Sequence, residues 1–245
     1  MLSYLVECEA LPLDIVRTDM ATFVRTGRKI VAIGRNFAEH AKELGNTSPR
    51  EPFFFLKPTS SYTPNKGIIE IPKGCVVHHE VELGVVIGKG GRDISKSDAY
   101  SFIAGYALAI DMTARNIQED VKKKGLPWST AKGFDTFTPI SEFIPKSAIS
   151  DPHNVNLWLK VNDDVRQNGN TKDMIYKIPR LIEHVSSIMT FEGPEGDLLL
   201  TGTPSGVGPI RTGDKITAGL ALPQSTENIV SLELHAIDRA GGYRF

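Results

Sequence analysis

Hydrophobic and polar positions alternate most clearly between Val76 and Ile87. One side of this segment carries aliphatic residues, namely Val81, Leu83, Val85 and Ile87. The other side carries polar or small residues, namely His78, Glu80, Glu82 and Gly84. Because successive side chains of a strand point to opposite faces, this period of two predicts a β-strand with one apolar face.

Short apolar runs elsewhere predict more strands, at residues 28–34, 53–56, 105–110, 155–162, 197–201, 215–220 and 229–236. Helical spacing predicts only three helices, at residues 37–44, 113–124 and 178–189. Gly125 follows the second helix as a favourable C-terminal residue, and Pro179 stands in the first turn of the third. The pattern therefore predicts a strand-dominated α+β fold of the roll or barrel type.

Composition narrows the class of protein. The chain has 245 residues with 28 Lys and Arg against 29 Asp and Glu, so a general positive field for binding nucleic acid is excluded. The longest apolar run, Phe102 to Ile110, falls far short of the roughly 20 residues that span a bilayer. Two cysteines form no disulfide framework, and the N-terminus resembles no secretory or transit signal. We expect a soluble intracellular protein that binds neither nucleic acid nor membrane.

Three carboxylates form the first candidate site. Glu80 and Glu82 share a strand face, and Asp111 ends the apolar run Ala104 to Ile110, where an unpaired buried charge would be costly. Such an oxygen-only set with open positions favours Mg²⁺ or Mn²⁺ over zinc. For the glutamates alone, the alternative is the solvent face of an amphipathic strand.

His40 and Glu43 form the second candidate, three residues apart on a predicted helix, where the carboxylate can orient the imidazole as a general base. The alternative is a surface pair. Lys57 and Lys132 are each suited to hold a substrate carboxylate or an enolate oxygen, or else are solvated loop residues. The glycine-rich segment 202–208 lacks a phosphate-loop ending, so its backbone N–H groups are expected to face a small anion.

Six motifs in order resemble the fumarylacetoacetate hydrolase family, in its short branch of acylpyruvate hydrolases and oxaloacetate decarboxylases or tautomerases. They are I-G-R-N-F-A-E-H with Glu43, F-F-L-K-P, H-E-V-E-L, D-M-T-A-R, K-K-G-L-P-W with K-G-F-D, and G-T-P-S-G-V-G. The motifs run from about residue 28 to about residue 238. Phe37 stands where many members have Tyr, and residues 1–26 match no motif. We therefore expect an N-terminal extension over residues 1–26 and a single catalytic domain over residues 27–245.

The resemblance implies the mixed β roll of the family, usually as a homodimer. Glu80, Glu82 and Asp111 match its metal ligands, for Mg²⁺ or Mn²⁺. His40 and Glu43 match a catalytic dyad in a lid that orders over bound ligand, and Lys132 matches a lysine that contacts substrate. The implied substrate-binding residues are Arg35, Arg115, Gln118 and Thr203.

The chemistry implied is formation of an enolate from a small 2-oxo acid such as oxaloacetate or an acylpyruvate, stabilised by the cation. Proton transfer, loss of CO₂ or attack of water would then give tautomerisation, decarboxylation or carbon–carbon hydrolysis. The sequence leaves these three outcomes open, as it does the choice between mitochondrial matrix and cytoplasm. The alternative function is a catalytically idle, metal-dependent dicarboxylate-binding module, for which a His–Glu base would be superfluous.

Overall fold

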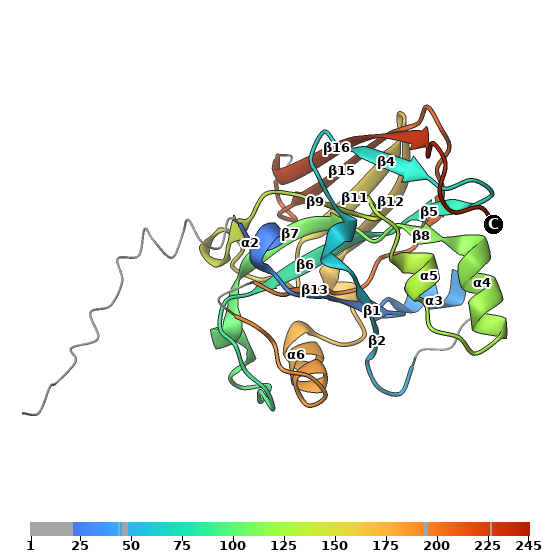
Figure 1. Ribbon diagram of the computed structural model, residues 1–245. Coiled ribbons are helices and arrows are strands. Elements are labelled where there is room, and N and C mark those ends of the chain that lie inside the picture. The colour runs from blue at the N-terminus through green and yellow to red at the C-terminus, as the bar shows by residue number, and fades with distance from the viewer. Residues whose placement is uncertain (1–21, 44, 46–48, 194–195, 226) are drawn as a thin grey trace, which may run out of the picture.

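Two curved sheets share one hydrophobic core in the computed structural model, which describes residues 22–43, 45, 49–193, 196–225 and 227–245 (Figure 1). The larger sheet has the order β2 (Phe53–Lys57), β1 (Ile30–Gly34), β13 (Leu198–Leu200), β6 (Val81–Ile87), β7 (Ile103–Ile110), β9 (Thr138–Ile140) and β3 (Tyr62–Pro64), with β10 (Ile144–Pro145) also paired to β7. The smaller sheet has the order β12 (Asp164–Asn170), β11 (Asn156–Val161), β15 (Lys215–Ala221), β16 (Asn228–Asp238) and β4 (Ile68–Ile71).

A third, short sheet lies near Glu80, Glu82 and Asp111 and is formed by segments that flank the longer strands and α4. It comprises β14 (Gly208–Pro209), β5 (Val77–His79) and β8 (Thr113–Ala114). Parallel pairs, such as β1 with β13 and β16 with β4, occur among mostly antiparallel ones. This mixture confirms the predicted strand-dominated α+β class and its mixed β roll.

The helices are short and lie around the sheets. The α-helices within the described residues are α2 (Phe23–Thr26), α3 (Ala38–Glu43), α4 (Arg115–Lys123), α5 (Ser129–Lys132) and α6 (Ile178–Ser186). Single 3₁₀ turns are η1 (Thr59–Ser61), η2 (Ala99–Phe102), η3 (Lys146–Ala148) and η4 (Thr171–Asp173). Figure 1 shows α3, α4 and α5 gathered on one side of the molecule, beside β5 and β8. No described helix is long and apolar enough to span a bilayer.

The three predicted helices are confirmed with shifted ends. The helix predicted from residue 113 begins at Arg115, because Thr113 and Ala114 pair with β5 instead. Gly125 follows it with φ +65°, as a residue after a helix end often does. The helix predicted over 178–189 ends at Ser186, and the one predicted over 37–44 is α3, with residue 44 outside the described residues.

The predicted strand over 76–87 is divided at Glu80 into β5 and β6. Its four aliphatic residues face the core between the two large sheets, as predicted. The opposite face of β6 is buried as well, because Val86 packs with Leu198 and Leu200 in a second, smaller cluster on the outer side of the larger sheet. Every residue of β6 is therefore buried, which removes the solvent-exposed face considered above.

Phe23 on α2 belongs to that second cluster and packs edge-on against Tyr62, with ring centroids 6.3 Å apart. It is 1 % exposed. Residues 22–26 of the predicted extension therefore contribute to the packing of the large sheet. Residues 1–21 lie outside the described residues.

Candidate active site

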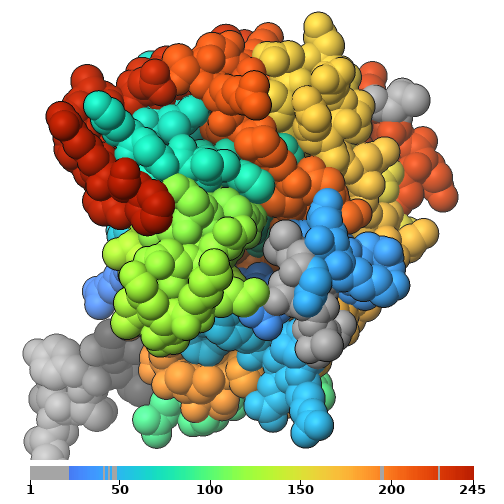
Figure 2. All heavy atoms as spheres, turned by 90° about the vertical axis from the view of Figure 1, so that its right-hand side faces the viewer, coloured from blue at the N-terminus to red at the C-terminus, as the bar shows by residue number. Residues whose placement is uncertain are grey.

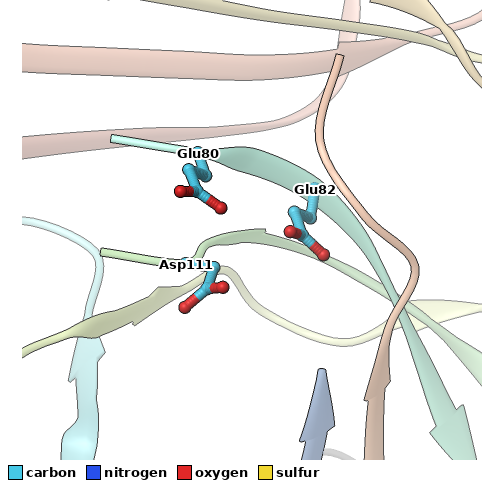
Figure 3. A group of neighbouring side chains, drawn as sticks. All are labelled: Glu80, Glu82 and Asp111. Carbon is cyan, nitrogen blue, oxygen red and sulfur yellow. The ribbon is translucent and has the colours of Figure 1, made fainter. Parts of the chain in front are cut away.

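The three predicted carboxylates meet where β6 and β7 pair (Figure 3). Glu80 precedes β6, Glu82 lies on it, and Asp111 follows β7 directly. The Asp111 N–H donates to the Glu80 carbonyl over 2.8 Å, which places the two side chains opposite one another. The three residues are 6 %, 2 % and 1 % exposed, and one oxygen from each lies within 4.8 Å of the others.

This donor set fits a hard divalent cation. It offers carboxylate oxygens only, whereas zinc prefers nitrogen and sulfur ligands. Three carboxylates leave positions free for water or substrate oxygens, as is usual for Mg²⁺ sites. The triad also lines a cavity of about 100 Å³, so a small ligand can approach it.

Three buried cations contact the same carboxylates. Lys132 Nζ lies 3.1 Å from Glu80 and 2.5 Å from Asp111. Arg115 bonds the other Glu80 oxygen and also Gln118, one helical turn further along α4. The interpretation of Lys132 as a solvated loop residue is wrong, because it is 1 % exposed.

Lys57 is the third cation, at the end of β2. Its Nζ lies 2.5 Å from Asp111 and also donates to the carbonyls of Phe137, at 2.8 Å, and Met112, at 3.3 Å. All three ammonium protons therefore have acceptors. The solvated alternative is wrong for Lys57 too, since it is 2 % exposed.

The pKa values of the two glutamates are shifted in opposite directions. Burial alone would raise the pKa of Glu80, but the positive charges of Lys132 and Arg115 outweigh it and hold that pKa below its usual range. Burial raises the pKa of Glu82, and the negative charges of Asp111 and Glu80 raise it further. The triad thus combines a firmly ionised carboxylate with one that is costly to ionise without an added cation.

The glycine-rich segment 202–208 encloses the site from the side of β13. The Gly202 N–H donates to Glu82 over 2.7 Å, and the Thr203 hydroxyl donates to the Val81 carbonyl over 2.8 Å. The Gly206 N–H donates to both oxygens of Glu43, at 3.1 and 3.2 Å. Two N–H groups of this segment therefore donate to carboxyl groups of the protein itself. A small bound anion facing this segment stays a prediction.

The His40–Glu43 pair predicted on a helix lies on α3, with His40 Nδ1 3.3 Å from Glu43. An ionised carboxylate only accepts hydrogen bonds, so Nδ1 carries the proton and Nε2 keeps a lone pair. His40 is 5 % exposed and lines the cavity, while the Glu43 side chain is 36 % exposed. The pair is therefore no mere surface contact: one end reaches the cavity and the other reaches the glycine-rich segment.

Figure 2 shows the cavity as a hollow between the green surface formed by α4 and α5 and the blue surface that includes α3. Of the predicted site residues, Glu43 and Lys57 do not line it, whereas the following do: Arg35, His40, Glu80, Glu82, Asp111, Arg115, Gln118, Lys132 and Thr203. Arg35, directly after β1, has φ +59°, an uncommon conformation for a residue with a side chain. Its guanidinium carbon lies 5.8 Å from the centroid of the Phe53 ring.

Sequence reasoning missed several lining residues. Phe55 and Trp128 form an aromatic wall, with ring centroids 5.3 Å apart, and Lys132 Nζ lies 5.0 Å from the Phe55 centroid. Glu119 and Lys122 line the cavity from α4. Their helical spacing after Arg115, at four and seven residues, was the available signal, because such positions share one face of a helix.

Comparisons with known proteins agree with this geometry. The profile described as "Fumarylacetoacetate (FAA) hydrolase C-terminal" matches residues 29–234. The chain is 59 % identical over 197 residues to "Oxaloacetate tautomerase FAHD1, mitochondrial" of Arabidopsis thaliana, covering 80 % of this chain and 87 % of that protein. It is 58 % identical over 203 residues to "Oxaloacetate decarboxylase, mitochondrial" of Dictyostelium discoideum, covering 82 % and 92 %.

Solved structures are similar over most of the chain. The yeast family protein ynq8 superposes with a TM-score of 0.80 at 36 % identity, covering 92 % of this chain and 99 % of that one. Fumarylpyruvate hydrolase from Pseudomonas aeruginosa, solved in complex with Mn²⁺ and pyruvate, superposes with a TM-score of 0.77 at 31 % identity, covering 87 % and 91 %.

Proposed function

Because the chain belongs to the fumarylacetoacetate hydrolase family, we propose that it is a divalent-metal-dependent enzyme that enolises oxaloacetate and related acylpyruvates. The observation that carries this proposal is one cavity lined by a base, His40, and by an oxygen-only acidic triad. A binding module would need the triad, but it would have no use for a base held by a carboxylate.

Glu80, Glu82 and Asp111 would hold the cation, and Mg²⁺ or Mn²⁺ suits their oxygen donors. A divalent cation there would draw electron density from a 2-oxo group and so acidify the neighbouring carbon. The similar fumarylpyruvate hydrolase was solved with both Mn²⁺ and pyruvate, a 2-oxo acid, which supports a divalent ion and a substrate of this class for this chain.

The residues of the chain supply the rest of the chemistry. His40 Nε2 accepts the proton from the carbon next to the 2-oxo group, and Glu43 stabilises the imidazolium that results. Lys132 provides positive charge beside the developing enolate oxygen. Returning the proton to oxygen or carbon gives tautomerisation, which needs no further group.

Arg35 lines the cavity and would bind the second carboxylate of a dicarboxylic substrate. Gln118 and Thr203 complete the substrate pocket in this proposal, while Arg115 acts mainly by fixing Glu80 and Gln118. Residues 27–245 would form the catalytic domain, to which α2 also contributes Phe23.

The test follows three products separately with Mg²⁺, with Mn²⁺ and with EDTA. Enol absorbance reports oxaloacetate tautomerisation, CO₂ release reports decarboxylation, and loss of acetylpyruvate reports hydrolysis. We expect metal-dependent tautomerisation to be the fastest of the three. Tight oxalate binding without turnover of either substrate would refute enzymatic function and favour the idle dicarboxylate-binding module.

Assembly and location belong to the same proposal. We propose a homodimer, which light scattering on the purified protein tests. The relatives from Arabidopsis and Dictyostelium are named as mitochondrial, which favours the mitochondrial matrix over the cytoplasm for this chain. Fractionation of cells that express the tagged full chain distinguishes the two compartments.

A further inference from the structure

A buried glutamine on a polar edge strand lies directly behind the site. Gln167 is 0 % exposed, whereas the other residues of β12 are exposed or half-buried. It has no place in the proposed chemistry, since it does not line the cavity. A buried primary amide needs hydrogen-bond partners to offset its lost hydration. Those partners identify the segments that the amide connects.

The Gln167 amide has four such partners. Its Oε1 accepts from the Val81 N–H over 3.0 Å and from His79 Nδ1 over 2.9 Å. Its Nε2 donates to the Thr203 hydroxyl oxygen over 2.8 Å and to the Pro204 carbonyl over 2.9 Å. The opposite amide orientation would set two donors against each other at Val81, so the assignment is fixed by the network.

These bonds join two parts of the site that are far apart in the sequence. Val81 lies between the two glutamates of the triad, so its N–H fixes the backbone that carries both. Thr203 belongs to the segment that encloses the site, and its hydroxyl donates in turn to the Val81 carbonyl. Gln167, Thr203 and Val81 therefore form a closed ring of hydrogen bonds between the strand and the segment.

Backbone packing extends this connection toward α3. A side chain at Gly206, where φ is +94°, would place its Cβ 2.0 Å from the Arg166 carbonyl oxygen, so the segment lies directly on β12. A Cβ at Gly169 would lie 2.5 Å from Pro204. The Gly206 N–H then reaches Glu43. The glycine-rich segment therefore packs directly against the strand β12.

We infer that Gln167 is a positioning residue that sets the glycine-rich segment against the strand of the metal ligands. Its oxygen holds the ligand strand, and its nitrogen holds the segment that faces the substrate. This inference rests on the proposed function for its effect on turnover, but its effects on Mn²⁺ and oxalate binding do not depend on turnover.

Two substitutions separate the two halves of the amide. Gln167→Glu keeps the oxygen that faces Val81 and His79, but it places a second oxygen against the Pro204 carbonyl and removes both donated bonds. We expect unchanged Mn²⁺ affinity, with the oxalate Kd and the oxaloacetate KM raised about tenfold. Gln167→Met removes all four bonds at similar size, so Mn²⁺ affinity should fall as well, by about 10-fold or more.

Asn168→Met is the matched control, because Asn168 is the next residue on β12 and is exposed. It should leave the Mn²⁺ affinity, the oxalate Kd and the KM at wild-type values. Melting temperature and circular dichroism confirm that each variant is folded. If Gln167→Met does not fold, Gln167→Glu still tests the inference.

Folded Gln167→Glu protein with wild-type oxalate Kd would overturn the inference, as would equal losses of Mn²⁺ and oxalate affinity in both variants. Absence of turnover in the wild type would refute the proposed function only. Isothermal titration with Mn²⁺ and then oxalate would still compare the effect of the amide oxygen on metal affinity with the effect of the amide nitrogen on oxalate affinity.

Discussion

The acidic triad and the His40–Glu43 pair face the same cavity, yet they are held very differently. Glu80 and Asp111 are buried, and each accepts hydrogen bonds from at least two side chains on other elements. Within the part of the chain that the structure describes, the His40 side chain is bonded to Glu43 alone, at 3.3 Å, and the Glu43 side chain is bonded beyond α3 by one backbone N–H. One region is fixed by several elements at once, and the other depends on a helix of six residues.

The difference matches what each region must do. Charges that stabilise a developing anion act best when they are oriented in advance, so that no reorganisation is needed during the reaction. A base that must admit substrate and then close over it is drawn from an element with few packing contacts. Under the proposed function, fixed charges and a base on a less firmly bonded helix would therefore share one cavity.

The largest expected effect comes from breaking the fixed region. Asp111→Asn removes the carboxylate shared by Lys57 and Lys132, which leaves two buried ammonium groups without their closest anion. We expect loss of Mn²⁺ binding and a fall in the free energy of unfolding of about 3–5 kcal/mol. Titration calorimetry and urea denaturation measure the two quantities.

Asp120→Asn is the control for that substitution. It removes an exposed carboxylate paired at 2.8 Å with Lys124, the residue that directly follows α4. Such exposed helical pairs contribute only about 0.3–0.5 kcal/mol. Wild-type stability of Asp111→Asn would contradict the description of the triad as the fixed region.

Breaking the region of His40 and Glu43 should affect the rate without affecting the stability. His40→Ala should lower kcat by about 10²–10⁴-fold, the usual contribution of a positioned base. The Mn²⁺ affinity and the melting temperature should stay at wild-type values, because the imidazole has one described partner. A wild-type kcat on both oxaloacetate tautomerisation and acetylpyruvate cleavage would exclude His40 as the base.

A smaller effect is expected where a fixed residue meets the ligand. Lys132→Met should raise the oxalate Kd by roughly 10–100-fold, since hydrogen bonds to charged groups contribute about 1.5–3 kcal/mol. Lys123→Met serves as the control, because Lys123 is exposed at the end of α4. Equal changes in the oxalate Kd of both variants would show that general charge, not position, binds the anion.

Glu43→Gln tests how the base is oriented. The amide oxygen can still accept the Nδ1 proton, but it no longer stabilises an imidazolium by charge. We expect a fall in kcat of about tenfold, smaller than that of His40→Ala. Steady-state kinetics of the two variants and of the double variant measure the coupling. A loss as large as that of His40→Ala would assign Glu43 a direct part in proton transfer.

The smallest expected effect is on the pH dependence of stability, and it concerns His153, a histidine outside both regions. His153 Nε2 accepts the Ile178 N–H at the start of α6, over 3.0 Å, so Nδ1 carries the proton and lies 3.3 Å from the Tyr100 hydroxyl. Burial lowers the pKa of His153, and Lys177 lowers it further against the opposing charge of Asp151. Protonation would cost the bond to α6.

Because the folded pKa is the lower one, the stabilisation from His153 is complete above the unfolded pKa of about 6.5. It is lost as the pH falls through the folded pKa. We expect the melting temperature of wild type to decline below about pH 6.5 and His153→Gln to decline less steeply. Parallel curves for the two proteins would show that His153 does not contribute to this acid sensitivity.

Much of the fold was predictable because its strongest elements carry local patterns. The alternation from Val81 to Ile87 identified β6, and helical spacing with Gly125 identified α4. The carboxylates and the His40–Glu43 pair were predictable because each stands at a defined position of such an element. For Lys132 the residues alone left a ligand-binding and a solvated role open, and the resemblance favoured the first.

Residues that depend on distant partners were not predictable in this way. Lys57 is buried because it meets Asp111, 54 residues further along the chain. The strand β12 was missed because its polar sequence has no apolar period, and Gln167 is buried through hydrogen bonds. One local signal was available: Asn162, with φ +57°, begins a two-residue connection between β11 and β12, as Asn often does in hairpins.

The position of β1 in the large sheet has a consequence for how the protein folds. Its partner β13 pairs with it in parallel, and Lys29 donates to Asp197 across 168 residues of sequence. Closing so long a loop is entropically costly, and chains dominated by such distant pairings fold slowly. In a ribosome-bound chain that ends at residue 200, β13 has not yet paired with β1, and the glycine-rich segment has not yet been synthesised. The cavity can therefore be completed only after Thr203, which lines it, has been synthesised.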